Sequence, residues 1–197
     1  AEILAGQFTL VATNVPYLGS NRQDDDLMNY CETQHFLAKA DLATCFVQRC
    51  LDFSIATGSV ALVTPQNWLF LGTYKNLRKG LLQQAHWDFV ARLGPRAFET
   101  IGGEVVNVSL LGITRCLPDL SHKFASLDVS SEKTPDVKKT ALLLQPTVQV
   151  EQRGQVQNKD CVLTFAEPSS LPLLEHYAAA LNGSHGGDSP RFRHVFW

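Results

Sequence analysis

The residues best suited to chemistry form the tetrapeptide Asn14-Val15-Pro16-Tyr17, which follows an apolar, β-prone run at 8–13. The side-chain amide oxygen of Asn14 and the carbonyl oxygen of Val15 can each accept a hydrogen bond. Pro16 restricts the residue before it and so holds the Val15 carbonyl in one direction. Tyr17 adds a flat ring. Two acceptors and a stacking ring suit a planar ligand that bears an amino group, such as adenine at N6.

Such a site would activate an amino nitrogen without a strong base. The two acceptors would hold both amino hydrogens and draw the nitrogen lone pair out of conjugation, so that the nitrogen attacks an electrophilic methyl group in line. Positioning and electrostatics would then dominate the rate. Taken alone, the tetrapeptide is also typical of an ordinary turn, because Asn and Pro are common there. The elements around the tetrapeptide therefore have to distinguish a binding site from an ordinary turn.

Those elements alternate between β-prone runs and amphipathic segments, which predicts an α/β sheet that is parallel at first and is closed by an antiparallel, hairpin-like pair at one edge. In such sheets ligands bind beyond the carboxyl ends of parallel strands, which is where the tetrapeptide lies. The expected elements are a buried strand at 8–13, a polar surface loop at 20–36, a helix that opens at Asp41 and ends at Gly58, a buried strand at 59–64, a helix through 74–82, and strands at 87–93 and 105–113.

The pattern changes after residue 115, and we expect residues 1–115 to form part of a catalytic domain and 116–197 to form an extension that leads into a target-recognition region. The extension has a polar, mixed sequence. The arginines of its tail could contact phosphates, or they could be ordinary surface residues. Its expected elements are a helix at 135–144, strands at 147–150 and 161–165, an amphipathic helix at 170–181 and a turn-rich tail.

Composition excludes several classes of protein. The chain is 45% hydrophobic and 18% charged, as in ordinary globular domains, and it has no long apolar run, so we expect no membrane partner. A net charge of -2 argues that this segment alone is no strong binder of nucleic acid. The five cysteines show no C-x-x-C spacing and the histidines no metal-binding pair, which predicts free thiols in a reducing, cytoplasmic compartment and no metal site.

The run 11–17 resembles the Asn-Pro-Pro-Tyr motif of amino-methyltransferases. With the segments that follow, the chain resembles the adenine-specific DNA methyltransferases of restriction-modification and phage-defence (BREX, PglX-like) systems. The likeness covers residues 8–115 well and the tail more loosely, and several segments in the right order are more specific than one tetrapeptide. The supporting segments are 41–46, 60–70, 93–98, 102–107 and 187–192.

This resemblance implies the C-terminal half of a Rossmann-like class I methyltransferase sheet, S-adenosylmethionine as donor, DNA as partner and a target adenine flipped out of the duplex. Other subunits of a defence system are a further implied partner. Asn14 and the Val15 carbonyl would hold the N6 amino group, Tyr17 would stack on the base, and Phe98 would pack on its other side. The residues implied to line the same crevice are Pro65, Gln66 and Trp68, although Trp68 is equally consistent with a core position.

Two departures from the family pattern have consequences. Val15 stands where the motif has proline, and since only its carbonyl is needed, we expect activity to survive with a less rigid loop. The Gly-rich loop and acidic residue that bind the donor would lie upstream of residue 8. Because Ala1 is no natural start and the chain ends as if within a strand, we expect a fragment that binds S-adenosylmethionine poorly and is inactive by itself.

Alternatives to adenine-N6 methylation of DNA stay open at this point. The same motif chemistry serves methylation of RNA or of a protein glutamine amide, although the long extension after residue 115 favours a DNA enzyme. A different class is a methyltransferase-like module without activity that binds DNA or partner subunits, and Val15 points mildly in that direction.

Overall fold

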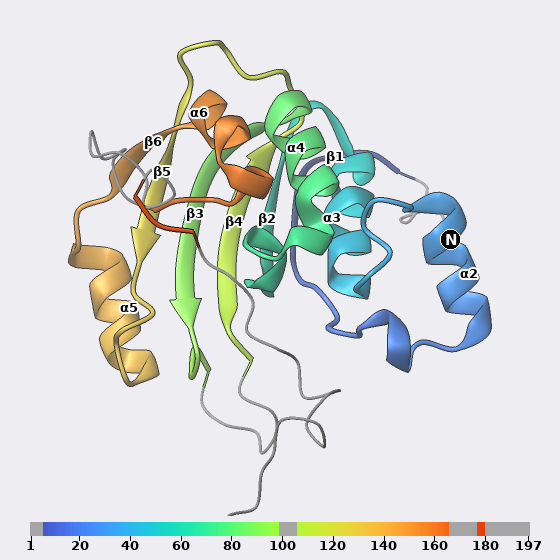
Figure 1. The fold of residues 1–197 in the computed structure, drawn as a ribbon, viewed down its shortest axis with the longest axis horizontal. Helices are drawn as coiled ribbons and strands as arrows, with labels where there is room; N and C mark the ends of the chain where they lie inside the picture. The colour runs from blue at the N-terminus through green and yellow to red at the C-terminus, as the bar shows by residue number, and fades with distance from the viewer. Residues whose placement is uncertain (1–5, 99–105, 166–176, 180–197) are drawn as a thin grey trace, which may run out of the picture. The chain divides into compact units, whose positions relative to one another are not determined.

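The computed structural model describes residues 6–98, 106–165 and 177–179. A six-stranded mixed sheet runs through its centre in the order β1-β2-β4-β3-β5-β6 (Figure 1). β1, β2, β3 and β5 point in the same direction, whereas β4 and β6 are antiparallel to their neighbours. The strands are β1 (Phe8–Asn14), β2 (Ser54–Pro65), β3 (His86–Gly94), β4 (Val108–Thr114), β5 (Lys123–Asp128) and β6 (Val148–Glu151).

Helices cover both faces of the sheet. α3 and α4 lie over one face, where they contribute to the larger apolar core together with strand residues such as Val90 (Figure 1). The neighbouring Ala91 points to the opposite face, because side chains alternate along a strand, and packs there with Ala141 of α5 in a smaller core. The helices are α2 (Asp25–Gln34), α3 (Leu42–Phe53), α4 (Lys75–Gln84), α5 (Pro135–Leu144) and α6 (Gln152–Gln157), with short 3-10 turns at 20–22, 67–69, 72–74 and 159–161.

Several elements agree with the sequence-based expectations. The Asp41 side chain accepts a hydrogen bond from the backbone N–H of Ala43 at 2.8 Å, so it caps α3 as predicted. The helix at 135–144 has the predicted bounds, and the strands β2, β3 and β4 overlap the predicted runs. None of the described helices is both long and apolar enough to cross a membrane.

The polar segment 20–36 is a helix over most of its length, so the predicted surface loop is wrong. Asp24 caps α2 by accepting from the backbone N–H of Leu27 at 2.8 Å. Asp25 and Asp26 then lie in the first turn, where negative charge is favourable beside the unpaired N–H groups of a helix start. The acidic run is therefore a helix-start signal.

Gly58 does not end α3, because that helix stops at Phe53 and β2 begins at the next residue. The glycine lies inside β2, and a Cβ atom there would stand 2.9 Å from the carbonyl oxygen of Phe8. Close approach of β1 thus explains the glycine.

β1 is not the buried strand that its apolar sequence suggested. It pairs only with β2 among the described residues, and both of its faces are largely open. Leu10 has 60% of its surface exposed. β1 is an edge strand in this part of the chain, which is why an apolar run fails to be buried.

The first half of the extension completes the same sheet. β5 pairs with β3 and β6 pairs with β5, and residues 1–167 form one compact unit, with 168–197 as a second. The expected structural break after residue 115 is thus absent, and the antiparallel pair β3-β4 lies within the sheet instead of at its edge. Residues 162–165 form no strand. The predicted helix at 170–181 and the tail lie largely or wholly outside the described residues.

Candidate active site

The carboxyl ends of β1, β2, β3 and β5 meet at one edge of the sheet. Asn14, the last residue of β1, is paired with Val63 of β2. Further across, Arg92 of β3 is opposite Ser109 of β4 on one side and Asp128 of β5 on the other. This edge, which we call the carboxyl edge, carries the loops after β1, β2 and β3.

Asn14 and Tyr17 contact each other at this edge. The Tyr17 hydroxyl donates to the side-chain oxygen of Asn14 at 3.3 Å, while the rest of the Asn14 side chain is exposed. Burial raises the pKa of Tyr17 above its usual 10.0, so the phenol stays protonated and remains a donor near neutral pH. Since a carbonyl oxygen has two lone pairs, the Asn14 oxygen keeps one for a ligand.

Val15 is constrained by burial and by a backbone hydrogen bond, although it lies in a loop. Its side chain is 3% exposed within the larger core, and its N–H donates to the carbonyl of Val63 at 3.2 Å. A proline could not make that bond. These contacts constrain the turn without a proline, and the reduced rigidity expected from the sequence stays a prediction. No described residue donates to the Val15 carbonyl, so the second acceptor of the turn is open.

The residues after β2 have three different environments. Trp68 is 2% exposed, and its ring N–H donates to the Thr64 hydroxyl at 3.1 Å. It is a core residue, which corrects its predicted place in the crevice. Pro65 ends β2 and is half-buried. Gln66 is 6% exposed, and its side-chain oxygen accepts from the Arg92 guanidinium at 3.2 Å.

Phe98 follows β3 at the same edge, with 53% of its surface exposed. Its ring is thus accessible, although it makes no ring contact with Tyr17. The predicted sandwich of a base between Tyr17 and Phe98 stays a prediction. Gly102 and Gly103, which follow in the loop, lie outside the described residues.

Sequence reasoning missed Arg92 and Asp128. Arg92 Nη1 lies 3.2 Å from Asp128 Oδ2, and the guanidinium lies 5.2 Å from the centre of the Phe70 ring. The available signal was a lone arginine in the otherwise apolar run 89–93, because a charge inside a buried strand needs a partner. Its partner is 36 residues later and shows no local pattern.

A buried arginine secures the loop after β2. Arg78 of α4 is 0% exposed and donates to the carbonyls of Leu71 at 2.8 Å, Asp160 at 2.7 Å and Cys161 at 3.0 Å, and also to that of Trp68. Burial lowers the pKa of Arg78, but four carbonyl acceptors stabilise its charge. The loop that carries Gln66 is thereby tied to the segment 159–161.

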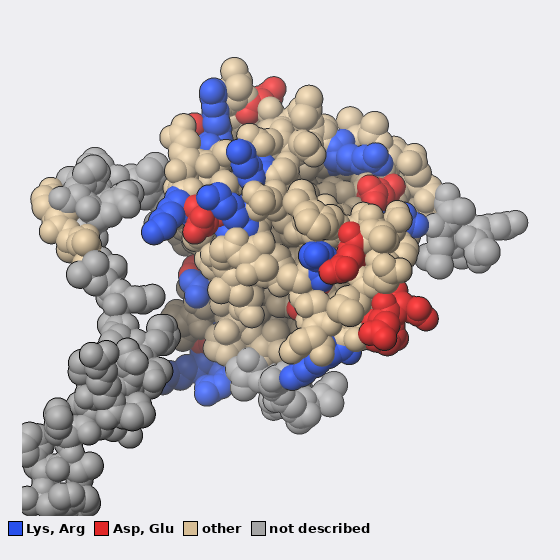
Figure 2. Space-filling view, turned by 45° about the vertical axis from the view of Figure 1, so that its right-hand side comes forward, with Lys and Arg blue, Asp and Glu red and all other residues tan. Residues whose placement is uncertain are grey.

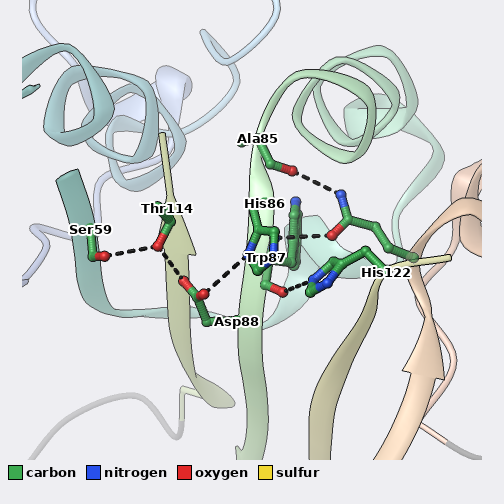
Figure 3. Close-up of polar contacts among 8 residues, drawn as sticks. Ser59, Ala85, His86, Trp87, Asp88, Thr114 and His122 are labelled. Carbon is green, nitrogen blue, oxygen red and sulfur yellow. Dashed lines mark hydrogen bonds and ion pairs between the residues drawn. The ribbon is translucent and has the colours of Figure 1, made fainter. Parts of the chain in front are cut away.

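The opposite edge of the sheet carries a second polar cluster, drawn in Figure 3. Thr114 contacts both Ser59 and Asp88, at 2.8 Å each, and Asp88 contacts His86 at 3.1 Å. The His86 ring stacks on that of His122 with centroids 3.6 Å apart. This chain of contacts joins strands β2, β4 and β3 to the start of β5.

Gln152 completes that second cluster from α6. Its side-chain oxygen accepts from the backbone N–H of Trp87 at 3.0 Å, and its nitrogen donates to the carbonyls of Leu82 at 2.7 Å and Ala85 at 2.8 Å. Every polar atom of this side chain is therefore bonded within the protein. We assign the second cluster a structural role.

The charged surface in view shows no single basic region. In Figure 2, Lys and Arg side chains are scattered among Asp and Glu on the face presented. This distribution matches the small net charge of -2. No continuous basic track for a phosphate backbone is visible on that face.

Comparison with known proteins finds a family model and curated proteins that are similar to part of this chain. The family model described as Eco57I restriction-modification methylase matches residues 2–98. The adenine-specific methyltransferase PglX of Lacticaseibacillus casei (strain Zhang) is 35% identical over 110 residues, which cover 55% of this chain and 9% of that protein. BrxX of Escherichia coli O9:H4 (strain HS), also named as an adenine-specific methyltransferase, is 37% identical over 109 residues, again 55% of this chain and 9% of that protein. Just over half of the chain is thus similar in sequence to adenine-specific methyltransferases.

Solved structures of methyltransferases share the fold. The methyltransferase subunit of a type I restriction-modification system from Streptococcus thermophilus gives a TM-score of 0.54 at 16% identity and covers 81% of this chain and 37% of that one. A nuclease-deletion mutant of the Type ISP restriction-modification enzyme LlaGI, solved with a DNA substrate mimic, gives 0.54 at 13% identity, with 75% and 17% covered. The predicted α/β methyltransferase fold is thus confirmed, and the chain spans a small part of its curated relatives.

Proposed function

We propose that this chain supplies the amine-binding edge of an S-adenosylmethionine-dependent methyltransferase that modifies adenine N6 in DNA within a restriction-modification or phage-defence system of the cytoplasm. One observation carries the proposal: two hydrogen-bond acceptors with unused capacity, Asn14 Oδ1 with its single donor and the Val15 carbonyl with none among the described residues, lie at the carboxyl end of β1 beside Tyr17. The adenine-specific relatives supply the substrate class.

The acceptors would act by orienting the amino group. Asn14 and the Val15 carbonyl would each take one N–H of the exocyclic amine, which directs the nitrogen lone pair away from the ring and toward the methyl donor. Tyr17 would hold the base plane and, through its hydroxyl, the Asn14 side chain. No group with a shifted acid–base equilibrium is needed as a proton acceptor before attack, because positioning supplies most of the effect.

The methyl donor needs residues beyond those described. A Gly-rich turn between a strand and a helix is the usual cradle for such a cofactor, and the described part of the carboxyl edge has none. We propose that other parts of the protein hold S-adenosylmethionine and most of the DNA, since the described residues carry no basic surface of the needed extent on the face in view. The edge strand β1 has one side without a strand partner among the described residues.

Methylation of plasmid DNA by the full-length parent tests the proposal. We expect Asn14→Ala to lower methyl transfer to adenine by about 100- to 1000-fold, the usual effect of removing one preorganised hydrogen-bonding group from an active site. Asn29→Ala, at an exposed position of α2, is the matched control and should retain activity.

Two results would contradict the proposal. Asn14→Ala with undiminished transfer would remove the amine-binding role from the tetrapeptide. A wild-type parent that binds DNA but transfers no methyl group would identify an inactive module instead. Circular dichroism of each variant separates a lost function from a lost fold.

A further inference from the structure

Gln66 is a buried side chain with one half of its amide unused. The residue is 6% exposed, and its oxygen accepts from Arg92 Nε at 3.2 Å. Its amide nitrogen makes no hydrogen bond with any residue that the structure describes, and it is not among the fully buried atoms that lack a partner, so it reaches the surface. An accessible, unused donor on a side chain that is otherwise buried offers a place for a ligand acceptor.

The orientation of this amide is determined by its partner. A guanidinium has only donors, so the Gln66 atom that faces Arg92 must be the oxygen, and the NH2 group must point elsewhere. Gln66 therefore presents two N–H donors on the side away from Arg92.

Arg92 is itself held in place on three sides. It is paired with Asp128 across β3 and β5, with 3.2 Å between Arg92 Nη1 and Asp128 Oδ2. Its guanidinium lies over the Phe70 ring at 5.2 Å, and Phe70 packs against Phe165 at 5.9 Å. A planar group fixed by an ion pair and a ring has little freedom to release the Gln66 oxygen.

The other two buried glutamines are bonded at both ends of the amide, although the half-buried Gln23 has a buried side-chain oxygen without a partner among the described residues. Gln152 bonds through its oxygen once and its nitrogen twice. In Gln155 the oxygen accepts from Asn158 and from the backbone and hydroxyl of Thr164, and the nitrogen donates to Glu151. Both lie away from the carboxyl edge.

We propose that Gln66 donates a hydrogen bond to a ring nitrogen of the target adenine, and that Arg92 is the positioning residue that keeps its donors turned toward the base. This inference rests on the proposed function. Adenine carries acceptors, N1 and N7, on either side of its amino group, so acceptors at Asn14 and a donor at Gln66, directly after the neighbouring strand, would complement one edge of the base. A purine with a carbonyl and a ring N–H in these places would face acceptor against acceptor and donor against donor, and would be rejected.

A double-mutant cycle with altered bases tests this inference in the full-length parent. The variant is Gln66→Glu, which keeps an oxygen for Arg92 and replaces the NH2 donor by an acceptor. The substrates are duplexes with adenine, 1-deazaadenine or 7-deazaadenine at the target position. Gln149→Glu, an exposed position on β6, makes the same change of charge and serves as the control.

We expect Gln66→Glu to lower kcat/KM on adenine by about 10- to 100-fold, the loss expected when a buried donor no longer meets its acceptor. One deaza base should lower the wild-type value by a similar factor and should lower the Gln66→Glu value no further. The inference would be overturned if the decreases in kcat/KM caused by Gln66→Glu and by each deaza base multiply independently. It would also be overturned if Gln66→Glu leaves kcat/KM unchanged. Multiplying factors would mean that the donor serves another acceptor, such as a phosphate.

Arg92→Met tests the positioning role. Without its partner the Gln66 amide can turn over, so the variant should lose discrimination between adenine and the sensitive deaza base while its unfolding midpoint changes little. Retained discrimination would give Arg92 a purely structural role. Methyl transfer by the wild type to unmodified adenine tests the proposed function separately. If this transfer is absent, the same cycle, measured through the Kd of each duplex, tests the role of Gln66.

Discussion

The two ends of the sheet use the same side-chain chemistry to opposite effect. At the carboxyl edge, Gln66 has one end bonded and one end open, and Asn14 Oδ1 has a single donor. At the other end, Gln152 is bonded at every polar atom and Thr114 contacts two partners. Burial alone does not distinguish the glutamines, since Gln66 is 6% and Gln152 is 1% exposed. Unused bonding capacity, and not polarity or burial, separates the proposed binding edge from the structural one.

The largest effect on folding should come from the closed cluster. Gln152→Leu leaves the Trp87 N–H and the carbonyls of Leu82 and Ala85 without partners, and we expect a loss of about 2–4 kcal/mol in the free energy of unfolding. Urea unfolding of this chain measures it. Gln66→Leu is the matched change at the carboxyl edge and should cost about 1 kcal/mol or less, because the third-exposed Arg92 can turn to water. Equal losses for the two variants would erase the contrast.

A smaller effect on the free energy of unfolding is expected from a substitution at Val15, in the turn at 14–17. Val15→Pro restores the residue of the family motif but removes the N–H that bonds to Val63. We expect a loss of about 1 kcal/mol in the free energy of unfolding, with methyl transfer by the parent retained, because the carbonyl at position 15 stays in place. Val15→Ala keeps the N–H and is the comparison for lost side-chain packing. A stabilised proline variant would show that the bond to β2 contributes nothing.

The smallest effect should come from Tyr17→Phe, which keeps the ring and removes the donor to Asn14. We expect a few-fold decrease in kcat and a change in unfolding free energy of about 0.5–1 kcal/mol. Because the folded pKa of Tyr17 is raised above 10.0, the stability that favours its neutral form is fully present below pH 10 and decreases as the pH rises through the folded pKa. The difference between wild type and Tyr17→Phe should therefore be constant from pH 7 to 9 and narrow above pH 10. A difference that widens there would reverse the sign.

Much of the carboxyl edge could be predicted because its signals are local. A β-prone run followed by Asn14 places that residue at a strand end, and Asp41 before an apolar periodic stretch predicts a helix cap. The same local rules failed for α2. The three consecutive aspartates at 24–26 predict part of a solvated loop, but they form the start of a helix. Trp68 was ambiguous in sequence, because burial depends on what packs over the turn after β2.

The rest of the carboxyl edge could not be predicted from the sequence, because it depends on pairing between segments that are far apart along the chain. β5 has a mixed, polar sequence and is a strand because β3 and β6 flank it. Asp128 orients Arg92 across that same pairing, so the open donor of Gln66 depends on a contact that no spacing in the sequence reveals. Local chemistry predicts the proposed amine-binding turn, whereas the role proposed for Gln66, directly after the next strand, can be recognised only in the folded sheet.

The four carbonyls gathered by Arg78 determine where this unit can be cut. A shortened gene product that ended after β4 would keep the turn at 14–17 but lose the Asp160 and Cys161 carbonyls, which leaves a cation inside the protein with half of its acceptors. The link between α4 and the segment 159–161 would then be lost, and with it one support of the loop after β2 that begins at Gln66. Anyone grafting this edge onto another scaffold must therefore carry the chain at least through Cys161.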